Sequence, residues 1–240
     1  MRLSFHGRTA LILGGGSEMG LALTALLRDE GVTVIATHAS EAGSEAIARR
    51  FPDLAGIRLE LGTHDFGSLQ PILDNGVDYL VDLAQGDLEG LAAAAGDEAE
   101  GYLEAHVSGR LRLLRAVTRS MLPRRFGRLI FVSSTAAALP APGQAFYGAA
   151  KRAAEGLYQS LGLELGTRGI TSVSLRLGLV DAGRGKRFLD GDDRRQTLGG
   201  KIVSLEQAAS TLLFLMSDQA LALTCTTITM DAGLTAQKYL

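Results

Sequence analysis

The chain has little of several features that identify whole classes of protein. Its 240 residues include one cysteine, Cys225, which excludes an intrachain disulfide and is typical of a reducing compartment. The formal net charge at pH 7 is only −2, so the charge balance does not favour nucleic acid or an anionic membrane as a partner. Aromatic residues make up 5%, which gives no indication of a pocket that stacks rings.

Long apolar segments are also missing. No apolar run reaches the roughly 20 residues that a bilayer-spanning helix needs, and residues 1–7 lack the apolar core of a signal peptide. No linker, repeat or low-complexity segment divides the chain, and its length suffices for one large α/β domain with a buried core. We therefore expect a cytoplasmic protein with a single domain over residues 1–240, and no metal site.

Short apolar runs alternate with segments of helical periodicity along the chain. Continuous apolar strands separated by helices predict an α/β fold, with a parallel sheet covered on both faces. Ser204, followed three residues later by Gln207, predicts a capping box at the start of a late helix. The expected strands are 9–13, 32–36, 57–61, 79–83, 129–132, 170–175 and 227–230, and the expected helices include 19–27, 41–50, 99–122 and 147–165.

Residues 181–200 interrupt this alternation. The segment is rich in glycine and in charges of both signs, and Phe188 and Leu189 form a small apolar island. A long segment without periodicity in a compact domain is usually a functional lid or a plain solvated loop. Because it follows a predicted strand, and α/β proteins bind ligands at the carboxyl ends of strands, we favour a mobile substrate lid.

Three residues carry the chemistry, namely Ser134, Tyr147 and Lys151. Tyr147 and Lys151 stand four residues apart in a predicted helix and therefore share one face. An ammonium beside a phenol favours the phenolate and lowers a pKa that is otherwise about 10. Ser134, at the end of an apolar run, can hydrogen-bond a carbonyl or alcohol oxygen while the tyrosine exchanges a proton with it. This is acid/base equipment for hydride transfer, which needs a hydride carrier because no side chain supplies one.

These three residues, with Gly14 to Gly20 after the first strand and Arg-Gly-Ile-Thr at 168–171, resemble the short-chain dehydrogenase/reductase family. Within it the chain is most similar to the 3-oxoacyl-[acyl-carrier-protein] reductases. The resemblance implies a single-domain Rossmann-type, doubly wound sheet and a nicotinamide cofactor. Ser134 would orient the substrate oxygen, Tyr147 would be the general acid/base, and Lys151 would bind the nicotinamide ribose. Cofactor contacts are implied for Tyr147 and Lys151 and for Gly14, Gly16, Ser17, Glu18, Met19, Gly20, Thr37, His38, Glu60, Ala84, Gly178 and Val180.

The chain departs from the family pattern mostly where the cofactor would bind. Leu13 stands where the family usually has threonine, and Glu18 replaces the glycine at which backbone approaches the pyrophosphate. A carboxylate at a helix N-terminus would compete with those phosphates, or it could simply cap the helix and point to solvent. Residues 82–85, Asp-Leu-Ala-Gln, replace Asn-Asn-Ala-Gly, and Leu177 replaces the proline before Gly178.

His106 stands where the family has its fourth catalytic residue, an asparagine in the long helix. An imidazole can donate and accept, so His106 either holds the relay water or is a packed histidine at a helix bend. Glu60, at the end of the third strand, either approaches the adenine or is a surface carboxylate.

Cofactor choice depends on the end of the second strand. An acidic residue there would bind the ribose hydroxyls of NAD and repel a 2′-phosphate, but Thr37 occupies the position and His38 follows. We therefore expect NADP(H) rather than NAD(H).

The resulting hypothesis is an NAD(P)(H)-dependent oxidoreductase that interconverts a ketone and a secondary alcohol, with a small-molecule or acyl-carrier-bound substrate. Arg125 and Arg168 match positions at which the acyl-carrier-protein reductases carry basic residues for their acidic partner, although basic residues are common on surface turns. The resemblance also implies a homotetramer built partly from the helices at 99–122 and 147–165. The alternative is a relative with impaired cofactor binding that acts as a lyase, isomerase or cyclase, or as a partner subunit of an active homologue.

Overall fold

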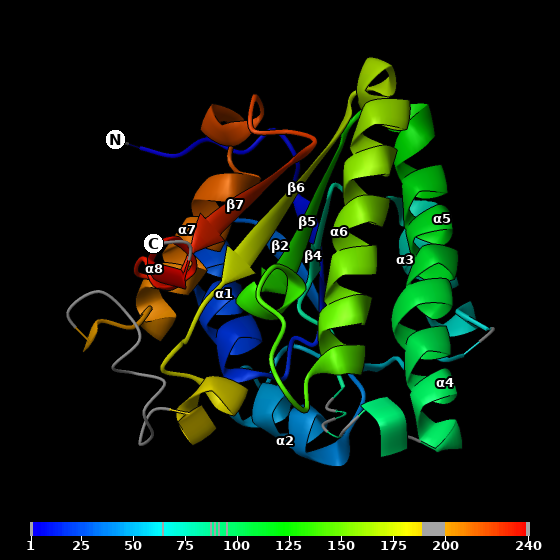
Figure 1. Ribbon diagram of the computed structural model, residues 1–240. Helices are drawn as coiled ribbons and strands as arrows, with labels where there is room; N and C mark the ends of the chain where they lie inside the picture. Colours follow the sequence, from blue (N-terminus) through cyan, green and yellow to red (C-terminus); the bar gives the residue numbers. More distant parts are fainter. Residues whose placement is uncertain are drawn as a thin grey trace.

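Seven parallel strands form one continuous sheet in the order β3-β2-β1-β4-β5-β6-β7 (Figure 1). This is a computed structural model, and it describes residues 2–63, 65–86, 88, 90, 92–94, 96–188 and 200–238. The predicted Rossmann-type parallel sheet is therefore confirmed. The strands are β1 (Thr9–Leu13), β2 (Thr33–His38), β3 (Ile57–Arg58), β4 (Tyr79–Asp82), β5 (Gly127–Ser134), β6 (Ile170–Leu177) and β7 (Thr226–Met230).

Helices cover both faces of the sheet, which explains why β1, β4, β5 and β6 are buried along most of their length. One layer of the core packs α1 and α7 against the sheet, and the other packs α3, α5 and α6 against the opposite face. The α-helices are α1 (Glu18–Asp29), α2 (Glu41–Arg50), α3 (Gln70–Asn75), α4 (Asp97–Leu103), α5 (Arg110–Met121), α6 (Ala145–Leu165), α7 (Leu205–Met216) and α8 (Leu234–Lys238).

Local signals set several of these boundaries. The Ser17 hydroxyl caps α1 by accepting a hydrogen bond from the Gly20 amide. At the start of α7, Ser204 and Gln207 form the predicted capping box, in which each side chain bonds the other residue's backbone. Among the described residues, no helix combines the length and the apolar character needed to cross a membrane.

Two predicted elements differ from the structure. The third strand pairs only over Ile57–Arg58, because the chain leaves the sheet after the Leu59 amide bonds the His38 carbonyl. The predicted helix at 99–122 is interrupted by a π-helical turn, η3 (Glu104–Gly109), which separates α4 from α5. The turn lies against the loop after β3, where a Cβ on Gly109 would stand 1.9 Å from the Leu61 carbonyl oxygen.

The carboxyl ends of the strands meet at one edge of the sheet, the lower edge in Figure 1. The order of the strands reverses between β1 and β4, and ligands of doubly wound folds bind outside such a switch point. Part of the predicted lid lies at the same edge, as the 3₁₀ helix η7 (Gly183–Phe188). Residues 189–199 of that segment lie outside the described residues.

Candidate active site

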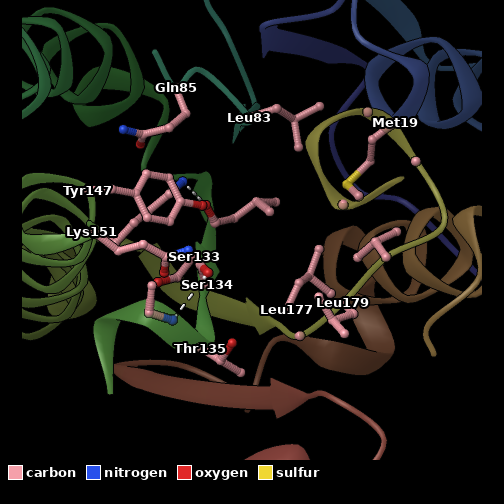
Figure 2. A pocket seen from close by; sticks show the side chains of 18 of the residues that line it. Met19, Leu83, Gln85, Ser133, Ser134, Thr135, Tyr147, Lys151, Leu177 and Leu179 are labelled. Atoms are coloured by element: carbon pink, nitrogen blue, oxygen red, sulfur yellow. Dashed lines mark hydrogen bonds between the residues drawn. The ribbon is translucent and has the colours of Figure 1, made fainter. Parts of the chain in front are cut away.

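Two adjoining cavities lie along this edge of the sheet. The first, of about 570 Å³, is bounded by the ends of β5 and β6, the start of α6 and the segment around η7 (Figure 2). The second, of about 630 Å³, is bounded by the glycine loop after β1, the ends of β2 and β3, and the π-turn η3. We call them the catalytic cavity and the adenosine-side cavity. Ser17, Leu83 and Gln85 line both, so these residues form the junction between them.

Three of the four residues predicted to be catalytic, Ser134, Tyr147 and Lys151, line the catalytic cavity, whereas the fourth, His106, lines the adenosine-side cavity instead. Tyr147 and Lys151 lie one turn apart on α6, and the Lys151 Nζ lies 5.7 Å from the centre of the Tyr147 ring. Lys151 is only 3% exposed, and its Nζ donates to the Val132 carbonyl at 2.7 Å. The backbone of β5 therefore fixes an ammonium beside the phenol.

Ser134 ends β5 and faces the same cavity, as Figure 2 shows. Its Oγ accepts a hydrogen bond from the Ala136 amide at 3.2 Å. The hydroxyl proton is not used in this contact, so Ser134 can donate it to a substrate oxygen. The preceding Ser133 also lines the cavity, and its buried Oγ has no hydrogen-bond partner among the described residues.

The loop after β1 requires glycine at three points. Gly14 adopts a φ of 71°, which L side chains rarely tolerate. A Cβ on Gly16 would lie 2.4 Å from the Gly43 carbonyl oxygen, and one on Gly20 would lie 2.6 Å from the Gly15 carbonyl oxygen. Backbone is thereby packed tightly around the N-terminus of α1.

Glu18 reaches across the cleft instead of capping α1 or pointing freely into solvent. Its carboxylate accepts hydrogen bonds from the Gly183 amide at 2.6 Å and from the Lys186 Nζ at 2.7 Å. The bond from Lys186 and then that from Gly183 lower the pKa of Glu18, so it is ionised near neutral pH. We call this contact the Glu18 latch. It ties the first turn of α1 to η7 and holds negative charge beside the glycine loop.

His106 is buried in the π-turn and lines the adenosine-side cavity. Its Nε2 accepts from the Gly86 amide at 3.1 Å, and its ring lies 4.4 Å from that of Tyr102. Burial, and then the charges of Arg110 and Lys151, lower the pKa of His106 to about 4. The ring is therefore neutral, and its Nδ1 has no partner among the described residues.

A buried charged network supports this wall of the cleft. Asp82 stands where the family resemblance placed an asparagine, and its Oδ2 accepts from the Arg110 Nε at 2.7 Å and from the Tyr158 hydroxyl at 2.9 Å. Arg110 also donates to the carbonyl oxygens of Ala84 and His106. Both partners of the ion pair are fully buried. Arg110 thus connects the end of β4 to the π-turn and occupies the His106 carbonyl.

The predicted adenosine contacts lie together in the second cavity, but several already have protein partners. Thr37 is buried, and its hydroxyl accepts from the Gly14 amide at 3.3 Å. The His38 Nδ1 lies 3.1 Å from the Ser40 carbonyl oxygen. Glu60 forms an exposed ion pair with Arg58 at 2.7 Å.

The structure brings together nearly all the residues that the sequence singled out. The catalytic cavity is lined by Ser17, Glu18, Met19, Ser134, Tyr147, Lys151, Gly178 and Val180, and the adenosine-side cavity by Gly14, Gly16, Ser17, Thr37, His38, Glu60, Ala84 and His106. Gly20 lines neither cavity and instead packs against the glycine loop from within α1. No group of three or more metal-ligating side chains occurs in the described part of the chain.

Sequence reasoning did not find Arg110, Tyr158 and Lys186 as partners of site residues. Arg110 follows His106 by four residues in a segment that reads as one amphipathic helix, so nothing local marks it as buried. The replacement of asparagine by Asp82 was the available signal, because a buried carboxylate needs a cation or several donors. Lys186 lies 168 residues from Glu18, and no local pattern connects them.

Arg125 and Arg168 lie at the opposite edge of the sheet, in the turns before β5 and β6. Both are exposed, and Arg125 donates to the Thr167 carbonyl at 3.0 Å. An eight-residue strand at about 3.3 Å per residue separates this edge from Ser134, which amounts to roughly 25 Å.

Comparison with known proteins gives a consistent result. The family described as short chain dehydrogenase matches residues 8–192. The 3-oxoacyl-[acyl-carrier-protein] reductase FabG of Salmonella typhimurium is 32% identical, over 97% of this chain and 99% of that relative. The protein of the same name from Escherichia coli is 31% identical, over the same shares of both chains.

Solved structures agree on the fold. A short chain dehydrogenase/reductase family protein is 26% identical and aligns with a TM-score of 0.83, over 98% of this chain and all of that one. A short chain dehydrogenase from Bacillus anthracis aligns with a TM-score of 0.86 at 21% identity, over 95% of this chain and 96% of that one.

Proposed function

This chain belongs to the short-chain dehydrogenase/reductase family of NAD(P)-dependent oxidoreductases, and we propose that it interconverts a ketone and a secondary alcohol with Tyr147 as the acid/base. The observation that carries the proposal is the meeting of Ser134, Tyr147 and Lys151 in one cavity that continues into a second cavity beside a glycine loop. A single domain in the cytoplasm, as the composition favours, is consistent with this activity.

The residues present fit a dinucleotide. The two cavities adjoin end to end, and the glycine loop leaves no room for a Cβ at Gly16 or Gly20. Buried polar atoms of Ser133 and Gln85 in the same cleft have no partner among the described residues, which favours an occupant with polar groups. When bound, the nicotinamide supplies the hydride and accepts it in the reverse direction.

Proton transfer is assigned to the side chains of the catalytic cavity. In reduction, the Ser134 hydroxyl donates a hydrogen bond to the substrate carbonyl oxygen, and Tyr147 gives that oxygen its phenolic proton as the hydride reaches carbon. In oxidation, the Tyr147 phenolate takes the alcohol proton. The Lys151 ammonium stabilises the phenolate form, and its hydrogen bond to the Val132 carbonyl keeps it beside the ring.

NADP(H) is the preferred cofactor in this proposal. The end of β2 carries Thr37 and His38 but no carboxylate that would repel a 2′-phosphate. Glu60, the acidic side chain lining the adenosine-side cavity, is paired with Arg58. The cavity therefore holds little uncompensated negative charge near the expected phosphate.

A 3-oxoacyl group is the substrate class that we favour. Apolar residues beyond the catalytic side chains, among them Leu139, Pro140, Leu179 and Leu234, can accept a hydrocarbon chain. The full-length FabG relatives are named for this substrate on a carrier protein. A carrier docked at Arg125 and Arg168 would stand roughly 25 Å from the catalytic cavity of the same chain. The acyl group would reach the catalytic cavity of this chain only on a tether of that length. Otherwise it would enter the catalytic cavity of a neighbouring copy in the expected homotetramer.

Charge reversal tests the docking of such a carrier. Arg125→Glu should weaken turnover of an acyl-carrier substrate and leave turnover of a small ketone unchanged. Equal effects on both substrates would count against docking at this position, and Arg49→Glu on the exposed face of α2 is the matched control.

One observation favours the alternative function. The Glu18 latch keeps a carboxylate beside the loop that would hold the pyrophosphate. A chain in which this carboxylate excludes the dinucleotide would use Tyr147 for lyase, isomerase or cyclase chemistry, or act as a partner subunit of an active homologue.

Titration with NADPH distinguishes the two functions. Binding, measured as a change in cofactor fluorescence, supports the oxidoreductase, and oxidation of NADPH by a 3-oxoacyl thioester establishes it. No binding at millimolar NADPH or NADH would overturn it in favour of the alternative.

A further inference from the structure

The junction between the two cavities presents one polar side-chain atom that the described protein leaves unpaired. Of the three residues that line both cavities, Leu83 is apolar. The Ser17 hydroxyl accepts from the Gly20 amide at 3.1 Å and donates to the Gly14 carbonyl at 2.8 Å. The Gln85 Oε1 is buried and has no partner among the described residues. Burial without a partner is unfavourable for an amide oxygen, so an occupant that donates a hydrogen bond to this atom would be stabilised there.

The neighbouring Tyr102 determines which end of the Gln85 amide remains unpaired. The Tyr102 hydroxyl donates to the Gly86 carbonyl oxygen at 3.0 Å. Because a hydroxyl has a single proton, it can only accept from Gln85, and the Gln85 Nε2 is the donor. The amide orientation follows from this bonding, and the oxygen is the end left over. Figure 2 shows Gln85 beside Tyr147 at the same end of the catalytic cavity.

An acceptor at this place selects the chemistry of its occupant. Phosphate groups near neutral pH offer mainly acceptor oxygens, which an amide oxygen repels, whereas a sugar hydroxyl donates. A dinucleotide that extends from the adenosine-side cavity to Tyr147 must pass the junction, and its ribose on the nicotinamide side lies next to the reacting ring. The Lys151 Nζ can donate to an oxygen of that ribose, which leaves the hydroxyl proton for Gln85.

We propose that Gln85 is a cofactor-binding residue whose Oε1 accepts a hydrogen bond from a hydroxyl of the nicotinamide ribose. The contact sets how far the dinucleotide enters the catalytic cavity, and Tyr102 is the positioning residue that keeps the amide turned the right way. This inference rests on the proposed function, because it requires that a dinucleotide binds.

Binding of three related ligands to two variants tests the contact. NADPH contains the nicotinamide and the ribose attached to it. 2′-Phospho-ADP-ribose keeps that second ribose but lacks the nicotinamide, and 2′,5′-ADP lacks both and keeps only the adenosine part. Gln85→Leu removes the acceptor at similar volume, and Tyr102→Phe removes the tether while leaving the acceptor. We expect calorimetry to show that Gln85→Leu weakens NADPH and 2′-phospho-ADP-ribose by about tenfold each and leaves 2′,5′-ADP unchanged. Tyr102→Phe should give a smaller loss with the same selectivity.

Each other outcome overturns the proposal. Equal weakening of all three ligands would make Gln85 structural, and weakening of NADPH alone would move the contact to the carboxamide. Unchanged affinities would remove Gln85 from the site. If Gln85→Leu does not fold by circular dichroism, Gln85→Gly removes the same acceptor and takes its place. Failure of the wild-type protein to bind NADPH would defeat the proposed function itself, whereas binding that ignores Gln85 would defeat only this inference.

Discussion

The catalytic residues Ser134, Tyr147 and Lys151 lie beside a second region, the glycine loop with the first turn of α1 and the end of β4, which we call the cofactor cradle. The two regions match the family pattern to different degrees. At the catalytic residues, Tyr147 and Lys151 have the spacing of the family, and the Lys151 ammonium is held by the backbone of β5. In the cradle, Glu18 and Asp82 place carboxylates where the family resemblance implies glycine and asparagine. Each of these carboxylates is paired, with Lys186 and Arg110 respectively.

The difference shows how the two regions depend on their surroundings. A proton-transfer site tolerates little change, because its two hydroxyls must meet the same substrate oxygen. The cradle can change provided that each new charge finds a partner, since an unpaired buried charge is costly. We therefore expect the fully buried Asp82–Arg110 pair to affect the free energy of unfolding. We expect the half-exposed Glu18–Lys186 pair to affect the affinity for the cofactor.

Removing the proposed acid/base should have the largest effect and tests the catalytic side of the comparison. Tyr147→Phe removes only a hydroxyl, so we expect turnover to fall by a factor of about 10² to 10⁴ or more. Steady-state kinetics measures this, and an unchanged circular dichroism spectrum is the control for folding. A variant that keeps most of its activity would show that the proton-transfer assignment is wrong.

Breaking the buried Arg110–Asp82 ion pair should have the next largest effect, and it should change the stability of the fold and not the chemical step. Arg110→Met leaves the Asp82 carboxylate buried without its cation, which we expect to lower the free energy of unfolding by about 3–5 kcal/mol. Urea denaturation measures the change, with Arg49→Met on the exposed face of α2 as the matched control.

A second substitution sharpens that result. Asp82→Asn combined with Arg110→Met removes both charges and should recover a large part of the loss. If the double variant is no more stable than Arg110→Met, the charge pairing is not what stabilises this wall.

Opening the Glu18 latch should change binding by a smaller factor. Glu18→Gly removes the carboxylate beside the glycine loop, and we expect the dissociation constant of NADPH to fall by about tenfold, or ~1.4 kcal/mol. Fluorescence titration measures it. Glu206→Gly removes an exposed carboxylate from the first turn of α7 and should leave the affinity unchanged. Equal dissociation constants for Glu18→Gly and the wild type would mean that the carboxylate does not compete with the cofactor.

The last prediction concerns the pH dependence of stability and His106. Its pKa lies near 4 in the folded chain, below the ordinary value of 6.5, so protonation favours the unfolded state. The free energy of unfolding should therefore decrease as the pH falls from about 6.5 towards 4, and this contribution should be constant above that range. Denaturation at several pH values measures the slope. His106→Gln should flatten it, and an identical slope in that variant would contradict the assignment.

The sequence predicted the sheet well because its central strands contain short apolar runs that are buried on both faces. It failed at the third strand, since alternating leucines at 59 and 61 report burial and not pairing. It also predicted one continuous helix over the π-turn, because apolar periodicity continues through residues 104–109. Spacing alone was sufficient to predict that the proposed catalytic residues line one cavity, because they lie on neighbouring turns of α6 or on the strand that α6 packs against.

The contacts that the sequence could not predict join distant parts of the chain. Glu18 and Lys186 come together only because the segment after β6 reaches the first turn of α1. Asp82 meets Arg110 only because of the register of α5 against β4. Gln85 presents a similar case. Its proposed role depends on the Tyr102 hydroxyl donating to the Gly86 carbonyl oxygen, which makes the Gln85 amide nitrogen the donor to Tyr102. No sequence pattern predicts this contact.

The π-turn at Glu104–Gly109 has a consequence for how this region can evolve. Each residue added to or removed from a helix rotates everything after it by about 100°. Deleting one residue of the turn would carry the guanidinium of Arg110 around the helix axis and away from β4. A deletion in this turn would therefore break the Arg110–Asp82 ion pair. Descendants of this protein can shorten the helix here only if they also replace Asp82.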